Sequence, residues 1–117
     1  MTSTRYIWKI VVNEEFLNCK YIYPIQQKKV LELVNYLKQN ENVKKIIIFG
    51  SSVTNRCHAS SDVDIYVELK KEQTKLIGRY FDFAFDLWTN YSVDERLLNE
   101  ILKKGVVVYE SNRNTSN

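Results

Sequence analysis

A short apolar run ending in glycine limits most strongly what this chain can fold into. Residues 44–50 have the sequence KKIIIFG, in which four consecutive apolar residues precede Gly50. A strand with one face in water would alternate apolar and polar residues, whereas an uninterrupted apolar run of this length is typical of a strand covered on both faces. The run therefore predicts a buried strand inside a small sheet.

Strand and helix patterns alternate along the rest of the chain. Pro24 suits the first position of a helix, which we expect to span residues 24–39. Ser92 and Glu95 form a capping box that predicts the start of a second helix, which ends at Gly105. Further strands are predicted at residues 5–12, 62–69, 79–88 and 106–110. This order predicts an α+β fold, an α/β sandwich with a small mixed sheet and helices packed on one side of it.

The chain divides into one domain and two flanking segments. A length of 117 residues is expected to form a single domain. We predict an N-terminal extension at residues 1–23 with an extra strand or hairpin, a main domain at 24–111 and a disordered tail at 112–117. The extension has more aromatic residues than a minimal domain needs, and an added edge strand or an interface explains them equally well. These residues are Tyr6, Trp8, Tyr21 and Tyr23.

Charge and hydropathy argue against two kinds of partner. Lys and Arg number 17 against 14 Asp and Glu, and the net charge of +3 is too small to predict a nucleic-acid-binding surface. No apolar run approaches the roughly 18 residues that a membrane-spanning helix needs, and the N-terminus has no signal-peptide pattern. We therefore expect a cytoplasmic protein with neither direct nucleic-acid binding nor membrane binding.

Two aspartates occupy the strand predicted at residues 62–69, although aspartate is a poor strand former and like charges repel. Asp62 and Asp64 are two residues apart, so their side chains project from the same face and can bind one or two hard cations such as Mg²⁺. A third carboxylate on another strand would complete such a site, and Asp82 and Asp86 are the candidates. The alternative is a solvated strand edge that binds no ligand.

The residues after the apolar run add a place for a phosphate group. Gly50 allows close backbone approach, and a short helix starting after Ser51, capped by Ser51 or Ser52, would present free N–H groups to an anion. The serine hydroxyls can donate further hydrogen bonds. A phosphate-binding turn beside paired carboxylates is what nucleotide phosphoryl transfer requires, because metal ions bridge the phosphates and neutralise the charge that develops on them.

The segment GSSVTNRCHASSDVD has the form G-S-x10-D-x-D, with Gly50 and Ser51 ahead of Asp62 and Asp64. It resembles the motif of the DNA polymerase beta-like nucleotidyltransferase superfamily, specifically of its minimal nucleotidyltransferase (MNT) members. The resemblance covers roughly residues 24–111 and implies the nucleotidyltransferase fold. It also implies that Gly50 and Ser51 bind the triphosphate of ATP and that Asp62 and Asp64 bind Mg²⁺, with two ions expected. Asp86 is implied as the third catalytic and metal-binding acid, in preference to Asp82.

The chain departs from the MNT pattern directly after the Gly-Ser turn. MNT proteins often have Ala-Arg-Gly there, and this chain has Val53, Thr54 and Asn55 instead. Arg56, two residues after the place of the missing arginine, is the substitute that we expect. The residues predicted to bind the nucleotide are therefore Gly50, Ser51, Ser52 and Arg56, and the predicted catalytic and metal-binding residues are Asp62, Asp64 and Asp86.

MNT proteins of this size are commonly the antitoxins of toxin–antitoxin pairs whose toxin is a HEPN-domain ribonuclease. The resemblance implies AMPylation, in which AMP is transferred from Mg·ATP to a hydroxyl of the toxin, expected to be a tyrosine. It also implies a hetero-oligomer with the toxin or a homo-oligomer. Two alternatives remain open: an inactive MNT-fold antitoxin that neutralises its toxin by binding alone, and a nucleotidyltransferase subunit that acts on a small molecule.

Overall fold

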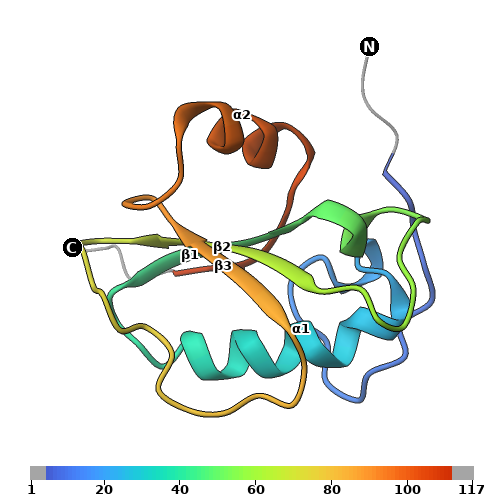
Figure 1. Cartoon of the computed structure of the whole chain (residues 1–117). Helices are drawn as coiled ribbons and strands as arrows, with labels where there is room; N and C mark the ends of the chain where they lie inside the picture. The colour runs from blue at the N-terminus through green and yellow to red at the C-terminus, as the bar shows by residue number, and fades with distance from the viewer. Residues whose placement is uncertain (1–4, 112–117) are drawn as a thin grey trace.

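Four strands form one mixed sheet in the computed structural model, which describes residues 5–111 (Figure 1). The strand order is β3-β2-β1-β4; β1 is antiparallel to both β2 and β4, and β2 is parallel to β3. Along the chain the elements are the 3-10 turn η1 (Cys19–Tyr21), α1 (Pro24–Leu37), β1 (Val43–Phe49), the 3-10 turn η2 (Gly50–Val53), β2 (Val63–Leu69), β3 (Phe85–Thr89), α2 (Glu95–Lys104) and β4 (Val106–Glu110). The predicted mixed sheet and the α+β class are confirmed.

Helix α1 packs against one face of the sheet and forms the main core with it. Val30, Leu33 and Leu37 on α1 are almost completely buried and lie in one cluster with alternate residues of the strands, such as Ile46 and Ile65. This clustering follows from two periods, because every third or fourth residue of a helix and every second residue of a strand share a face. The apolar stripe formed by these α1 residues is therefore the surface that covers this side of the sheet.

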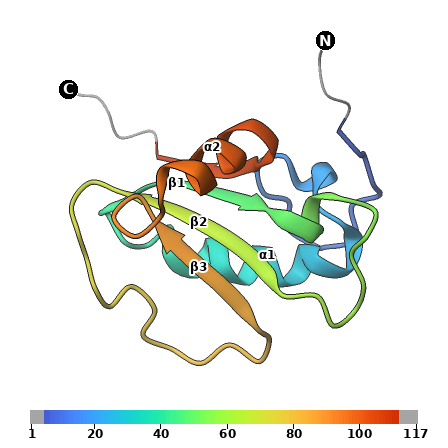
Figure 2. The same ribbon diagram turned by 45° about the horizontal axis from the view of Figure 1, so that its top comes forward.

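Helix α2 covers the opposite face, so the expectation that the helices pack on one side is wrong (Figure 2). Ile101 of α2 is fully buried and packs with Ile47, Phe49 and Tyr66, which project away from α1. The physical reason lies in the uninterrupted apolar run of β1. The consecutive apolar residues 46–49 need cover on both faces of the strand, as the run itself predicts, and α2 supplies the second cover.

The two helices begin and end close to the predicted positions, with one different cap. Helix α1 begins at Pro24, as predicted, and ends at Leu37. Asp94, not Ser92, caps α2, because the Asp94 side chain accepts a hydrogen bond of 2.8 Å from the backbone N–H of Leu97. The Ser92 hydroxyl instead accepts a hydrogen bond from the N–H of Thr89, the last residue of β3.

The strand predicted at residues 79–88 forms only from Phe85 onward, and residues 70–84 are irregular. Parallel neighbours such as β2 and β3 need a long crossover, and here it has neither helix nor strand. Aromatic contacts hold it against α1, where the rings of Tyr36 and Phe81 meet edge to face at 5.7 Å. The hydroxyl of Tyr36 also accepts a hydrogen bond of 2.8 Å from the N–H of Gly78.

Residues 5–23 form no strand or hairpin, so the strand predicted at residues 5–12 is wrong. Residues 5–11 have no regular secondary structure, and isolated hydrogen bonds hold them: the N–H of Trp8 donates to the carbonyl oxygen of Lys20, and Gln27 of α1 accepts from the N–H of Val11 and donates to the carbonyl oxygen of Lys9. The predicted tail at 112–117 lies outside the described residues. In the part of the chain that the structure describes, no helix is long and apolar enough to cross a membrane.

Candidate functional site

The turn after β1 brings the backbone of Gly50 against the side chain of Asp64. Gly50 has φ +77°, a left-handed conformation that glycine adopts without strain. A Cβ atom at this position would overlap the Asp64 carboxylate, so only glycine leaves space for that side chain. Phe49 is the register partner of Asp64, so the carboxylate lies where β1 passes into the Gly-Ser turn. The first half of the predicted site is thereby assembled on adjacent antiparallel strands.

Asp86 lies beside Asp64 on the neighbouring strand. The two residues are register partners in the parallel pair β2 and β3, and both project from the α2 face of the sheet, beyond the apolar contacts of that helix. Asp64 is half-buried and Asp86 is exposed. Asp62 is exposed at the residue before β2 begins. Asp82, the rejected candidate, is exposed in the irregular crossover, four residues before Asp86.

The three predicted acids act on one another electrostatically. The pKa of Asp64 is raised to about 6, first by burial, then by the negative charge of Asp86 and then by that of Asp62. None of the salt bridges among residues 5–111 includes any of these three carboxylates. Uncompensated carboxylate oxygens on neighbouring strands are the donor type that Mg²⁺ prefers, so the residues present fit a hard cation.

The three acids are not arranged as a complete three-ligand metal site. Among the described residues, no group of three or more His, Cys, Asp or Glu side chains is arranged so that it could hold a metal ion. Asp64 and Asp86 are the pair that the strand register brings together, with Asp62 outside the strand. A Mg²⁺ ion bound by one or two carboxylates, with water and substrate phosphates as its other ligands, fits such a pair. The metal-binding role of all three acids stays a prediction.

The two serines of the turn have different environments. The helix expected after Ser51 is only the four-residue η2, and no side chain caps it, so neither serine has the predicted capping role. Ser52 is 0% exposed, and its hydroxyl accepts a hydrogen bond of 3.0 Å from the side-chain amide of Gln26. Ser51 is partly exposed. Ser51 is therefore the hydroxyl of this turn that a nucleotide could reach, whereas Ser52 connects the turn to α1.

Arg56 is exposed in the loop between η2 and β2. Its guanidinium takes part in no salt bridge among residues 5–111, and its backbone N–H donates a hydrogen bond of 3.2 Å to the hydroxyl of Thr54. A free cation in the loop that connects the Gly-Ser turn to Asp62 is available to an anionic ligand. The predicted contact between Arg56 and the nucleotide remains a prediction.

Sequence reasoning missed Gln26, a fully buried residue that contacts the turn. A signal for it exists, because Gln26 lies four residues before Val30 and seven before Leu33. A polar residue at that spacing continues an apolar helical stripe into the core. Buried polar side chains need hydrogen-bond partners, so such a residue indicates a specific contact.

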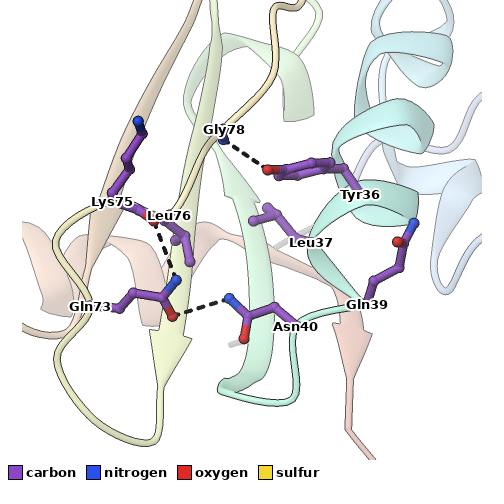
Figure 3. Close-up of a pocket in the computed structure, with 8 residues that line it drawn as sticks. All are labelled: Tyr36, Leu37, Gln39, Asn40, Gln73, Lys75, Leu76 and Gly78. Carbon is purple, nitrogen blue, oxygen red and sulfur yellow. Dashed lines mark hydrogen bonds between the residues drawn. The ribbon is translucent and has the colours of Figure 1, made fainter.

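A separate cavity of about 340 Å³ lies at the other end of α1 (Figure 3). Several of its polar groups bond to one another: the Asn40 amide donates to Oε1 of Gln73 at 3.1 Å, and the backbone N–H of Gly78 donates to the hydroxyl of Tyr36. None of the predicted site residues lines it. It is lined by Tyr36, Leu37, Gln39, Asn40, Gln73, Lys75, Leu76 and Gly78. This cavity has no carboxylate, so it lacks the chemistry of the Gly50–Asp64–Asp86 region.

Comparison with protein families gives one match. The family described as Polymerase beta, Nucleotidyltransferase matches residues 32–114, which is most of the chain. No curated protein matches the sequence. The matched range contains the Gly-Ser turn and all three predicted acids, and it begins after the first two turns of α1.

Proposed function

The chain belongs to the polymerase beta nucleotidyltransferase family, and from that membership we propose that it transfers AMP from ATP to a tyrosine of a HEPN-domain ribonuclease toxin. Nucleotidyl transfer is the general activity of the family, whose members use a nucleoside triphosphate and a divalent metal ion. The choice of ATP, the tyrosine acceptor and the antitoxin role of an MNT protein rest on the sequence motif. The product is a modified toxin whose RNA-cleaving site is blocked.

One observation supports this proposal above the others: Asp64 lies against Gly50 and in register with Asp86, with no compensating cation among residues 5–111. Bound Mg²⁺ would be held by Asp64 and Asp86, with Asp62 nearby, and would neutralise charge on the phosphates. We assign the triphosphate to Gly50 and Ser51.

Exposed side chains supply the remaining roles. Asp86, the accessible member of the in-register pair, accepts the proton of the acceptor hydroxyl. The hydroxyl oxygen then forms a bond to the α-phosphorus, and the bond between the α-phosphorus and the bridging oxygen breaks to release pyrophosphate. Arg56 has the charge and the exposure to contact the departing phosphates. Ser52 is buried, so we assign it to holding the turn and not to contacting the nucleotide.

Transfer of label from α-labelled ATP to the co-purified HEPN partner tests the proposal. The double variant Asp62→Asn plus Asp64→Asn should abolish labelling, because it removes two of the three carboxylates while conserving side-chain volume. Asp82→Asn is the matched control, since Asp82 is an exposed acid outside the strands and should leave labelling unchanged. Labelling of the partner by the double variant at the wild-type rate would overturn the assignment.

A second function, neutralisation of the toxin by binding alone, is favoured by a different observation. Within the described residues the acids do not form a group of three that could hold a metal. The same double variant separates the two functions, when cell growth is measured during toxin expression. Growth that is rescued by the double variant as well as by wild type would favour binding, whereas loss of rescue together with loss of labelling would favour AMP transfer.

A further inference from the structure

We propose that Gln26 is a positioning residue for the proposed transfer reaction, holding both ends of the loop that connects the Gly-Ser turn to Asp62. The effect of Gln26 on transfer rests on the proposed function, whereas its support of the loop rests on hydrogen bonds alone. The loop is the x10 segment of the motif, residues 52–61, and it contains Arg56. Its geometry decides where Arg56 and Asp62 lie relative to the turn.

The side-chain amide of Gln26 contacts the first and the last residue of this loop. Its Nε2 donates to the hydroxyl of Ser52 at 3.0 Å and to the carbonyl oxygen of Ser61 at 3.2 Å. Gln26 is 0% exposed; its bond to Ser52 is buried, and its bond to Ser61 is partly buried. One buried group thus closes a loop whose middle residues are mostly exposed.

Hydrogen bonds inside the loop connect only near neighbours. The N–H of Thr54 donates to the carbonyl oxygen of Ser51, and the N–H of Ser61 donates to that of His58. Such local turns fix short pieces of the loop but do not fix the distance between its ends. The β1–β2 pairing, which ends at Phe49 and Asp64, brings the ends of the loop near each other, and the Gln26 amide joins them directly, because both ends bond to the same nitrogen.

The N-terminal part of the chain adds a second contact to the same turn. The N–H of Tyr23 donates to the carbonyl oxygen of Ser52 at 2.8 Å. Both Tyr23 and Gln26 precede residue 32, where the match to the family begins. The support of this loop therefore comes from a part of the chain that the family match does not cover.

The environment of the other amide atom indicates that Gln26 is not placed for stability alone. Its Oε1 is buried and has no hydrogen-bond partner among the described residues. A buried acceptor without a partner is unfavourable, and an apolar side chain would continue the stripe of α1 without that disadvantage. Gln26 in the apolar stripe is accounted for by the two contacts that its Nε2 makes with the loop.

Gln27 offers a matched control at the next position. It is also 0% exposed, and its side chain makes three hydrogen bonds, to Lys9, Val11 and Ile22. All three partners lie in the N-terminal segment and none lies in the loop. Gln26→Met and Gln27→Met therefore remove buried amides of the same size from the same helical turn, but only the first removes side-chain hydrogen bonds to the loop itself.

The experiment is hydrogen–deuterium exchange of the loop peptide in the full chain without nucleotide. We expect Gln26→Met to exchange about tenfold faster at residues 52–61, since two hydrogen bonds to the loop are lost. Gln27→Met should show a much smaller increase there, because it reaches the loop only through the Ile22–Tyr23 peptide group. Ser52→Ala removes one of the two contacts and should give a smaller increase. Loop exchange unchanged in Gln26→Met, or raised equally in Gln27→Met, would overturn the proposal.

Transfer kinetics on the same variants test the catalytic part. Gln26→Met should raise KM for Mg·ATP about tenfold and lower kcat less, because Arg56 and the turn are less often in the binding arrangement. Unchanged kinetics with a loosened loop would refute the catalytic role while leaving the structural one. Absence of transfer by the wild-type chain would refute the proposed function itself, and the exchange result would still decide the loop.

Discussion

The two faces of the sheet differ in how completely they are covered. On the α1 face, alternate residues such as Ile46 and Ile65 are 0% exposed and belong to one continuous core. On the α2 face, the helix packs over Ile47 and Tyr66 but leaves the end of the sheet at Asp64 uncovered. One strand, β2, contributes to both faces, because successive side chains point in opposite directions. Stability and chemistry are therefore assigned to neighbouring residues of the same strand.

The acids are tolerated because they lie on the incompletely covered face of the sheet. An aspartate at position 65 would be buried without a partner, whereas the one at position 64 keeps contact with water. The division between a face for stability and a face for chemistry can be tested on both faces, by changing Asp64 or by changing Ile65.

The largest effect is expected for Asp64→Asn on AMP transfer. Loss of the half-buried carboxylate next to Gly50 should lower kcat/KM at least about 1,000-fold, since charge stabilisation at such sites is worth several kcal/mol. Circular dichroism should show an unchanged fold, because asparagine has nearly the same volume. Retention of more than a tenth of wild-type activity would show that the site lies elsewhere.

Ile65→Ala should lower the stability of the fold, in contrast to Asp64→Asn, which lowers transfer. Ile65 is 0% exposed in the α1-face core, so the cavity left by the smaller side chain should lower the free energy of unfolding by about 2–5 kcal/mol. Urea denaturation measures this loss. Ile7→Ala is the control, because Ile7 is 66% exposed, and its expected change is within about 0.5 kcal/mol. Similar losses for both variants would contradict the difference between core and surface.

Gly50→Ala tests the close contact between the Gly-Ser turn and Asp64 on the α2 face of the sheet. The new Cβ would overlap the Asp64 carboxylate at a backbone φ of +77°, so we expect a loss of about 1–3 kcal/mol in stability and reduced transfer. Gly78→Ala is the matched control, because its Cβ would meet only the Tyr36 hydroxyl at 3.2 Å. Equal thermal stability of Gly50→Ala and wild type would mean that the turn can move away from Asp64.

Local patterns predict those parts of the structure that depend on neighbours in the sequence. The apolar run of β1, the start of α1 at Pro24 and the alternation of β2 follow from periodicity and turn chemistry. The same alternation predicts that Asp64 faces away from Ile65. The residues alone left Asp82 and Asp86 as candidates for a third acid on another strand, and the motif resemblance selected Asp86.

Features that depend on distant contacts could not be predicted in this way. An amphipathic pattern shows which side of α2 is apolar, but it does not show which face of the sheet that side covers. Ser92 and Asp94 are both good caps; in the structure Asp94 accepts from the N–H of Leu97, whereas Ser92 contacts Thr89. Gln26 contacts residues 26 and 35 positions further along the chain, and no local rule specifies such partners.

The smallest effect is a pH dependence of stability that depends on Asp64. Its pKa is raised to about 6 in the folded protein from an ordinary value of 3.8, so the folded state binds this proton more tightly than the unfolded state does. The stability that the folded state gains from binding this proton is fully present below about pH 3.8 and is lost as the pH rises through about 6. Asp64→Asn should therefore gain stability relative to wild type between pH 4 and pH 7, by about 1 kcal/mol or less because solvent screens a partly exposed carboxylate.

Asp86→Asn tests whether this pH dependence arises from the carboxylates on the α2 face. Burial is the first cause of the raised pKa of Asp64 and the charge of Asp86 is the second. Removing that charge should therefore lower the pKa of Asp64 and reduce the change of stability with pH, without abolishing it. Urea denaturation of wild type, Asp64→Asn and Asp86→Asn at several pH values measures all three curves. A wild-type curve parallel to that of Asp64→Asn would mean that the carboxylate titrates near its ordinary value, and that the α2 face leaves Asp64 as accessible to water as any surface acid.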